Sequence, residues 1–214
     1  MSAALFIDHM LVDPDLQAEI IARCQATTVP DEPTSVANDL GALDLPDGTH
    51  IKVWLIHAAD TVMLDEHGQV ALITRLHNPG RGKLALPGGL LDATANGIEP
   101  SVTAALREAV EETGISSTLL QQASVTQLGH RRAARPFDIR RAWNNLPGTP
   151  IRRGDLFMVS TLGFCVRLTG NLRDIAFKAG DDAGSVEIRP VCDITMKVLA
   201  VPDHLDLIRA AITA

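Results

Sequence analysis

The stretch that decides the fold runs from Leu84 to Ile115 and reads LALPGGLLDATANGIEPSVTAALREAVEETGI. Its second half predicts an amphipathic helix that begins near Pro100, because proline suits the first helical turn, and ends near Gly114, a typical C-terminal residue. Between these ends, apolar and small residues recur at spacings of three and four and predict one buried face. The expected members of that face are Val102, Ala105, Leu106, Ala109, Val110 and Thr113.

The other face of this helix concentrates negative charge. Glu108, Glu111 and Glu112 are three or four residues apart or adjacent, so their carboxylates crowd one patch beside Arg107. A divalent cation that prefers oxygen ligands would offset the repulsion, and Mg²⁺ is the usual choice where phosphates are bound. A solvated, glutamate-rich face is the alternative interpretation. The preceding strand and its Pro-Gly-Gly turn favour the metal, because glycine lets the backbone approach a ligand closely.

These residues resemble the signature of the Nudix hydrolase family. Its second half is a glutamate, seven residues and then Arg-Glu-x-x-Glu-Glu-x-Gly, and the chain matches it in full from Glu99 to Ile115. The first half departs, because nine residues rather than five separate Gly89 from Glu99. We keep Gly88 and Gly89 as the family's glycines, since Pro87 precedes them and insertions in loops are tolerated.

The resemblance implies a fold and a metal site. The expected fold is α/β, a Nudix-type α/β/α sandwich with a mixed β-sheet over residues 51–214, after an N-terminal extension over residues 1–50. The expected ligands of Mg²⁺, or of Mn²⁺ in its place, are the oxygen donors of Glu108, Glu111, Glu112 and Gly88. Arg107 and Glu99 are expected to orient the site. The general base stays open among four acidic residues, Glu111, Asp181, Asp182 and Glu187.

Other stretches resemble the ADP-ribose pyrophosphatase branch of the family, among them residues 79–89, 135–138, 152–155, 180–183 and 203–204. This resemblance implies hydrolysis of a nucleoside diphosphate linked to another group. ADP-ribose is the first expectation, with AMP and ribose 5-phosphate as products. The alternatives are a house-cleaning hydrolase of nucleoside triphosphates or dinucleoside polyphosphates, and a non-catalytic module that senses a ligand.

A concentration of positive charge supports a phosphate-containing substrate. Between Arg131 and Arg153 there are seven arginines, and Asp138 is the only acidic residue. Guanidinium groups match phosphate oxygens, although a solvated basic loop is the alternative. The expected substrate-binding residues are Arg81, Arg135, Arg152 and Arg153. Trp143 in the same loop either stacks on a base or packs against the protein.

Composition limits the remaining classes of protein. The 214 residues are 46% hydrophobic, with a net charge of −7, which argues against a protein that coats nucleic acid. No apolar run is long enough for a membrane span or a secretory signal. Three widely spaced cysteines fit no disulfide framework. We therefore expect a cytoplasmic protein that binds neither nucleic acid nor membrane. The resemblance implies a small nucleotide substrate and a homodimer, and we expect residues 1–50 to pack either on the Nudix domain or across that dimer.

Outside the signature, the pattern predicts five further features. A helix should begin at Pro14 with Asp13 as its cap, and an irregular connection should follow over residues 29–48. A hairpin is expected around residues 65–68 and a strand over residues 156–168. The last helix should begin at Asp203, whose side chain is expected to cap it.

Overall fold

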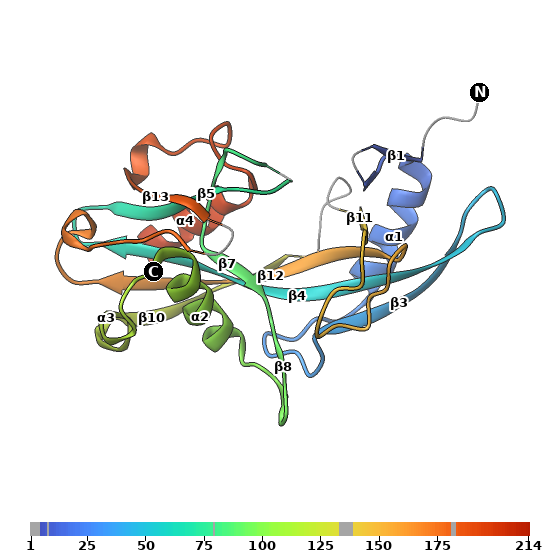
Figure 1. Ribbon diagram of the computed structural model, residues 1–214, viewed down its shortest axis with the longest axis horizontal. Helices are drawn as coiled ribbons and strands as arrows, with labels where there is room; N and C mark the ends of the chain where they lie inside the picture. Colours follow the sequence, from blue (N-terminus) through green and yellow to red (C-terminus); the bar gives the residue numbers. More distant parts are fainter. Residues whose placement is uncertain (1–4, 8, 79, 133–138, 181–182) are drawn as a thin grey trace. The chain divides into compact units, whose positions relative to one another are not determined.

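A computed structural model describes residues 5–7, 9–78, 80–132, 139–180 and 183–214, with only the backbone described at residues 130–132 (Figure 1). The chain forms two compact units, each assembled from separate segments. Unit 1 comprises Met1–Ala58, Leu90–Pro100 and Arg131–Thr161. Unit 2 comprises Ala59–Gly89, Ser101–His130 and Leu162–Ala214. The domain boundary expected near residue 50 stays a prediction.

Unit 1 combines one helix with short strands and the first parts of two long ones. Its elements are β1 (Phe6–Ile7), β2 (Met10–Leu11), α1 (Pro14–Ala26), β3 (Ala37–Asp44), β8 (Ala93–Thr94), β9 (Gly97–Ile98), β11 (Arg140–Arg141) and the first parts of β4 (His50–Asp65) and β12 (Leu156–Leu168). Antiparallel pairing joins β1 to β2, β2 to β11, β11 to β12 and β3 to β4. Ile20 and Cys24 of α1 pack into a core with Leu43, Val53 and Met158.

The start of α1 is as predicted, and the irregular connection after it is not. Asp13 Oδ1 accepts hydrogen bonds from the backbone nitrogens of Asp15 and Leu16, so the helix is capped. The expectation of irregular structure over residues 29–48 is wrong for β3, which pairs with β4. The register shifts between Asp39 and Ala42, where Gly41 has a φ of 89°. A β-bulge thus explains why these residues read as a loop.

Unit 2 contains the remaining elements and the remaining parts of β4 and β12. They are β5 (Gln69–Arg75), β6 (Leu84–Ala85), α2 (Ser101–Thr113), α3 (Ser117–Gln122), β10 (Ser124–Arg132), β13 (Ala183–Pro190), α4 (His204–Thr213), and the 3-10 helices η2 (Leu172–Asp174) and η3 (Val191–Asp193). β7 (Gly88–Leu90) follows β6. Antiparallel β5 pairs with β4, β6 and β13, whereas Leu84 makes a parallel bridge to Leu199. The pairing in this unit is therefore mixed, as expected.

Strands β4 and β5 separate two apolar layers in unit 2. Val62 of β4 belongs to one cluster with Leu207 of α4, whereas the next residue, Met63, belongs to another with Ala109 of α2 and Leu120 of α3. Successive residues of a strand point to opposite faces, so α4 covers one face and α2 and α3 cover the other. The predicted α/β/α sandwich is confirmed in this unit (Figure 1).

The predicted hairpin, long strand and signature helix are also present. Asp65 Oδ1 accepts hydrogen bonds from the backbone nitrogens of His67 and Gln69, which fixes the hairpin turn between β4 and β5. β12 occupies residues 156–168, and α2 begins at Ser101 and ends before Gly114, whose φ is 64°. In the described part of the chain, no helix is both long and apolar enough to cross a membrane.

Candidate active site

Helix α2 presents two of its carboxylates to one guanidinium group. Arg107 Nη1 lies 2.8 Å from Glu108 Oε1 and 2.9 Å from Glu111 Oε2. Glu108 is the more buried of the two, with a side chain 16% exposed against 44% for Glu111. The ion pairs hold both carboxylates on the same side of the helix, as the spacing of the residues predicted. Arg107 thus orients the acidic patch.

The third carboxylate of the patch, that of Glu112, is more buried than the sequence predicted. We expected Glu112 on the polar face, but it is buried, and its Oε2 accepts a hydrogen bond of 2.9 Å from the backbone nitrogen of Gly88. Burial raises the pKa of Glu112 to about 7, and the negative charges of Glu108 and Asp60 act in the same direction. The hydrogen bond from Gly88 and the charge of Arg75 oppose this rise. The carboxylate therefore connects α2 directly to the Pro-Gly-Gly turn.

Close packing surrounds both glycines of this turn, with backbone atoms against Gly88 and the end of the Glu108 side chain against Gly89. A Cβ atom at Gly89 would collide with the Glu108 carboxylate, and one at Gly88 would collide with Asp60 and the carbonyl oxygen of Ala59. Neither collision involves a positive φ, so space rather than backbone conformation selects glycine here. These contacts support the assignment of Gly88 and Gly89 as the glycines of the signature.

A buried pair behind the same turn was missed by sequence analysis. His204 Nδ1 accepts a hydrogen bond of 3.0 Å from the backbone nitrogen of Leu86, and its Nε2 lies 3.1 Å from Asp60 Oδ2. An acceptor at Nδ1 leaves the proton at Nε2, which donates to Asp60. The expected capping of α4 by Asp203 is wrong, since its side chain makes no cap hydrogen bond. An aspartate inside the apolar strand β4 was the available signal for this pair.

The candidate general bases differ in what the structure shows. Asp181 and Asp182 lie outside the described residues. Glu187 is engaged on β13, where its Oε2 pairs with Arg189 at 2.6 Å and its Oε1 accepts a hydrogen bond from Thr74. Glu111 is the exposed member of the patch on α2. Of the described candidates, Glu111 alone belongs to that patch.

The long loop of the signature contains a hairpin. β8 pairs with β9, so the extra residues form an exposed two-stranded projection. At its base, Glu99 donates from its backbone nitrogen to Asp92 O at 2.9 Å and accepts from Asp92 N through Oε2 at 3.2 Å. Glu99 is buried and belongs to unit 1, whereas Arg107 and the three carboxylates belong to unit 2. The insertion therefore leaves Glu99 in a defined local structure.

The four candidate substrate-binding arginines are not equivalent. Arg135 lies outside the described residues. Arg81 is exposed in unit 2, in a tight turn between two glycines of positive φ. In unit 1, Arg152 Nη1 donates to the carbonyl oxygens of Thr149 and Ile151, so its guanidinium is partly occupied. Arg153 instead lines a cavity of unit 1.

The donor atoms of the patch suit a hard divalent cation. All are carboxylate oxygens, and the negative charges of Glu108 and Asp60 act on Glu112. In the described residues, no three Asp, Glu, His or Cys side chains are grouped closely enough to hold a metal ion. Arg107 occupies the oxygens of Glu108 and Glu111 instead. The chemistry of the patch thus fits a cation that would share these carboxylates with Arg107.

Comparison with known protein families agrees with this site. The model of the NUDIX domain matches residues 55–155, a range that contains the glycine turn, Glu99 and the acidic patch. It ends at Asp155, just before β12 begins. The comparison with curated proteins found no significant match.

Similar solved structures were also found. The NUDIX domain of Shewanella oneidensis NrtR, solved with ADP ribose, is 22% identical with a TM-score of 0.50, over 73% of this chain and 86% of that one. A bifunctional NMN adenylyltransferase/ADP ribose pyrophosphatase from Francisella tularensis is 20% identical (TM-score 0.46; 73% and 40% covered). A C. elegans Ap4A hydrolase is 17% identical (TM-score 0.48; 73% and 95% covered). At these identities, the likeness to the first structure concerns the fold alone.

Proposed function

Because residues 55–155 of this chain match the NUDIX domain, we propose that the protein is a pyrophosphohydrolase, an enzyme that cleaves phosphoric anhydride bonds. One observation carries the proposal: the acidic patch of α2 is built against the Pro-Gly-Gly turn, through the hydrogen bond from Gly88 N to Glu112 Oε2. A solvated glutamate face would not need a buried carboxylate or two glycines without space for a Cβ.

The patch would hold a divalent metal ion, Mg²⁺ in the first place and Mn²⁺ in its stead. Its ligands would be Glu108, Glu111, Glu112 and the carbonyl oxygen of Gly88. When bound, such an ion polarises the diphosphate and lowers the pKa of the attacking water molecule. Arg107 keeps Glu108 and Glu111 in register on α2, and Gly88 N keeps Glu112 in place. Pre-formed placement of these groups lowers the cost of reorganisation during the reaction.

Glu111 is the described residue best suited to accept the proton of the attacking water. It is exposed, belongs to the patch and is held through one oxygen by Arg107. Asp181 and Asp182 remain candidates from the sequence. Glu99 would orient the loop that carries the hairpin. Arg81, Arg135, Arg152 and Arg153 would bind the phosphates of the substrate.

The substrate would be a nucleoside diphosphate linked to another group, with ADP-ribose first. Hydrolysis of ADP-ribose would yield AMP and ribose 5-phosphate. The arginine-rich segment supports an anionic substrate, since it has seven arginines and one acidic residue in an acidic protein. We place the enzyme in the cytoplasm as a homodimer, for which light scattering at micromolar concentration should give twice the chain mass of 22.9 kDa. A strict monomer would contradict the dimer.

A substrate panel with Mg²⁺ tests the proposal. ADP-ribose, NADH, diadenosine polyphosphates and nucleoside triphosphates should be compared for release of the expected products. Glu112→Gln should lower turnover of the best substrate by about a hundredfold or more, because it removes an anionic ligand beside the phosphates. Glu66→Gln, an exposed hairpin residue, is the matched control. Near-wild-type turnover of Glu112→Gln at saturating Mg²⁺ would overturn the metal assignment.

A further inference from the structure

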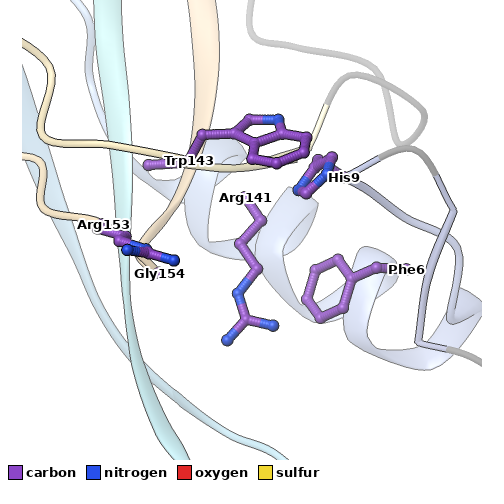
Figure 2. Close-up of a pocket in the computed structure, with 7 residues that line it drawn as sticks. Phe6, His9, Arg141, Trp143, Arg153 and Gly154 are labelled. Atoms are coloured by element: carbon purple, nitrogen blue, oxygen red, sulfur yellow. The ribbon is translucent and has the colours of Figure 1, made fainter.

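Unit 1 contains a cavity of about 580 Å³, of which the proposed function uses only the lining residue Arg153 (Figure 2). It lies where the hairpin of β1 and β2 meets the segment that runs from β11 to β12. Its walls come from both parts, and the lining residues are Phe6, His9, Arg141, Ala142, Trp143, Arg153 and Gly154. Binding pockets for small molecules typically have volumes of roughly 300–1,000 Å³, and this one is large enough for a mononucleotide.

The charge of the described lining is positive. Arg141 and Arg153 both line the cavity, and no acidic side chain is among the described lining residues. Asp155 follows the lining segment, but its Oδ2 accepts hydrogen bonds from Trp54 Nε1 at 3.0 Å and from Arg152 N at 2.9 Å. Hydrogen bonds from Thr49 lower the pKa of Asp47 most, and the positive charge of Arg141 contributes least. An anion fits this cavity better than a cation does.

Two contacts position the rings of the lining, one between two rings and one between a guanidinium group and a ring. His9 and Trp143 have ring centroids 3.4 Å apart at an interplanar angle of 35°, and the Arg141 Cζ lies 5.1 Å from the centre of the Phe6 ring. Figure 2 shows these two pairs around the same space. The whole chain has only five Phe and two Trp residues, so two of its seven such rings line this cavity.

Exposure of the Trp143 ring points to a ligand. Trp143 is 67% exposed, the highest value of any large apolar residue in the described part of the chain. His9 has a φ of 66°, which fits its place in the turn between β1 and β2 and is more common for histidine than for most residues. An exposed aromatic surface is typical of binding sites, where a ligand covers it.

We propose that this cavity binds a nucleoside monophosphate group, with its base on Trp143 and its phosphate on Arg141 and Arg153. Stacking suits any base, because every base has a flat π face, and guanidinium groups suit phosphate oxygens. The proposal shares only the phosphate role of Arg153 with the proposed hydrolysis. Binding without turnover therefore tests it separately.

Calorimetric titration of the metal-free full chain with AMP, adenosine and ribose 5-phosphate tests the site. AMP should bind more tightly than either fragment. Arg141→Gln should raise the Kd of AMP about ten- to a hundredfold, as expected for loss of a charge-assisted hydrogen bond. Trp143→Leu should raise the Kd of AMP and adenosine about tenfold and leave ribose 5-phosphate unchanged.

Two further variants make the outcome decisive. Arg209→Gln removes an exposed arginine of α4 in unit 2 and should leave AMP binding unchanged. If Arg141→Gln fails to fold, Arg153→Gln on the exposed side of the cavity replaces it. Glu112→Gln separates the two proposals, since it should lower turnover about a hundredfold or more and retain AMP binding. Equal AMP affinity of wild type, Arg141→Gln and Trp143→Leu would overturn the nucleotide site, as would ribose 5-phosphate binding as tightly as AMP.

Discussion

The acidic patch of unit 2 and the cationic cavity of unit 1 are built in opposite ways. The patch is carried by one regular helix, α2, and each of its carboxylates has a defined partner in Arg107 or Gly88. The cavity is lined by two-residue strands, turns and exposed rings. Regular elements hold groups more precisely than loops do, which suits chemistry at a metal, whereas loops suit variable recognition. The difference predicts that changes in the patch affect turnover and changes in the cavity affect affinity.

Gly89→Ala should have the largest effect and would test the precision of the patch. The added Cβ would overlap the Glu108 carboxylate and displace it from α2's patch. We expect turnover of the best substrate to fall about a hundredfold or more, in line with loss of one charge-stabilising group. Gly184→Ala is the control, because its added Cβ would come no closer than 3.0 Å to a neighbouring atom, against 2.2 Å from the Glu108 carboxylate at Gly89. A loss of less than threefold in steady-state turnover would show that the close contact is dispensable.

The pH dependence of the free energy of unfolding would show whether the folded protein disfavours the ionised form of Glu112. Its folded pKa of about 7 exceeds its ordinary value of 4.5, so the folded state binds its proton more tightly than the unfolded state. Its contribution is therefore fully present below pH 4.5, and is lost as pH rises to about 7, a loss on the order of 3 kcal/mol. Chemical denaturation without metal should show this decline for wild type and a flatter profile for Glu112→Gln. Parallel profiles would contradict the raised pKa.

His204→Ala should separate support of the turn from the chemistry of the patch. It leaves the buried nitrogen of Leu86 without its acceptor and Asp60 without its donor, which should cost about 1–3 kcal/mol of unfolding free energy. His204→Asn offers a shorter acceptor and should recover part of that loss. Denaturant titration measures both. Equal stability of His204→Ala and wild type would show that this pair does not support the glycine turn.

The smallest expected effect distinguishes two neighbouring arginines. Arg153→Ala should raise KM for the best substrate about tenfold with little change in kcat, because contacts equal in ground and transition states appear in KM. Arg152→Ala should change KM less, since its guanidinium already donates to the carbonyl oxygens of Thr149 and Ile151. Steady-state kinetics of the two variants would decide. Equal KM changes would remove the distinction that the structure draws.

The sequence predicted the elements whose signals are local. The cap at Asp13, the hairpin turn at Asp65 and the C-terminal glycine of α2 each depend on residues a few positions apart. Strand β3 was missed because its bulge at Gly41 carries residues typical of loops. The pair of Asp60 and His204 was missed because the two residues are 144 positions apart in the sequence. Periodicity along one segment cannot reveal a contact between residues so distant.

The sequence predicted which residues form the acidic patch better than it predicted how buried they are. The spacing on α2 correctly grouped Arg107 with two glutamates, since neighbours on a helix surface follow from helical geometry alone. It gave the wrong environment for Glu112, because burial there results from the turn at Gly88, which approaches from elsewhere in the chain. The cavity of unit 1 combines residues near the N-terminus with residues beyond 140, which only folding brings together.

The β8–β9 hairpin has a practical consequence for work on this protein. Its two ends are joined through the backbone and side-chain hydrogen bonds between Asp92 and Glu99, while its tip is exposed and includes Asn96 and Gly97, the latter with a φ of 126°. A tip of this kind tolerates changes in length, because the clamp at its base isolates Glu99 from whatever lies beyond. A short epitope or a genetically encoded label could therefore be spliced between Asn96 and Gly97, as a handle for purification or imaging.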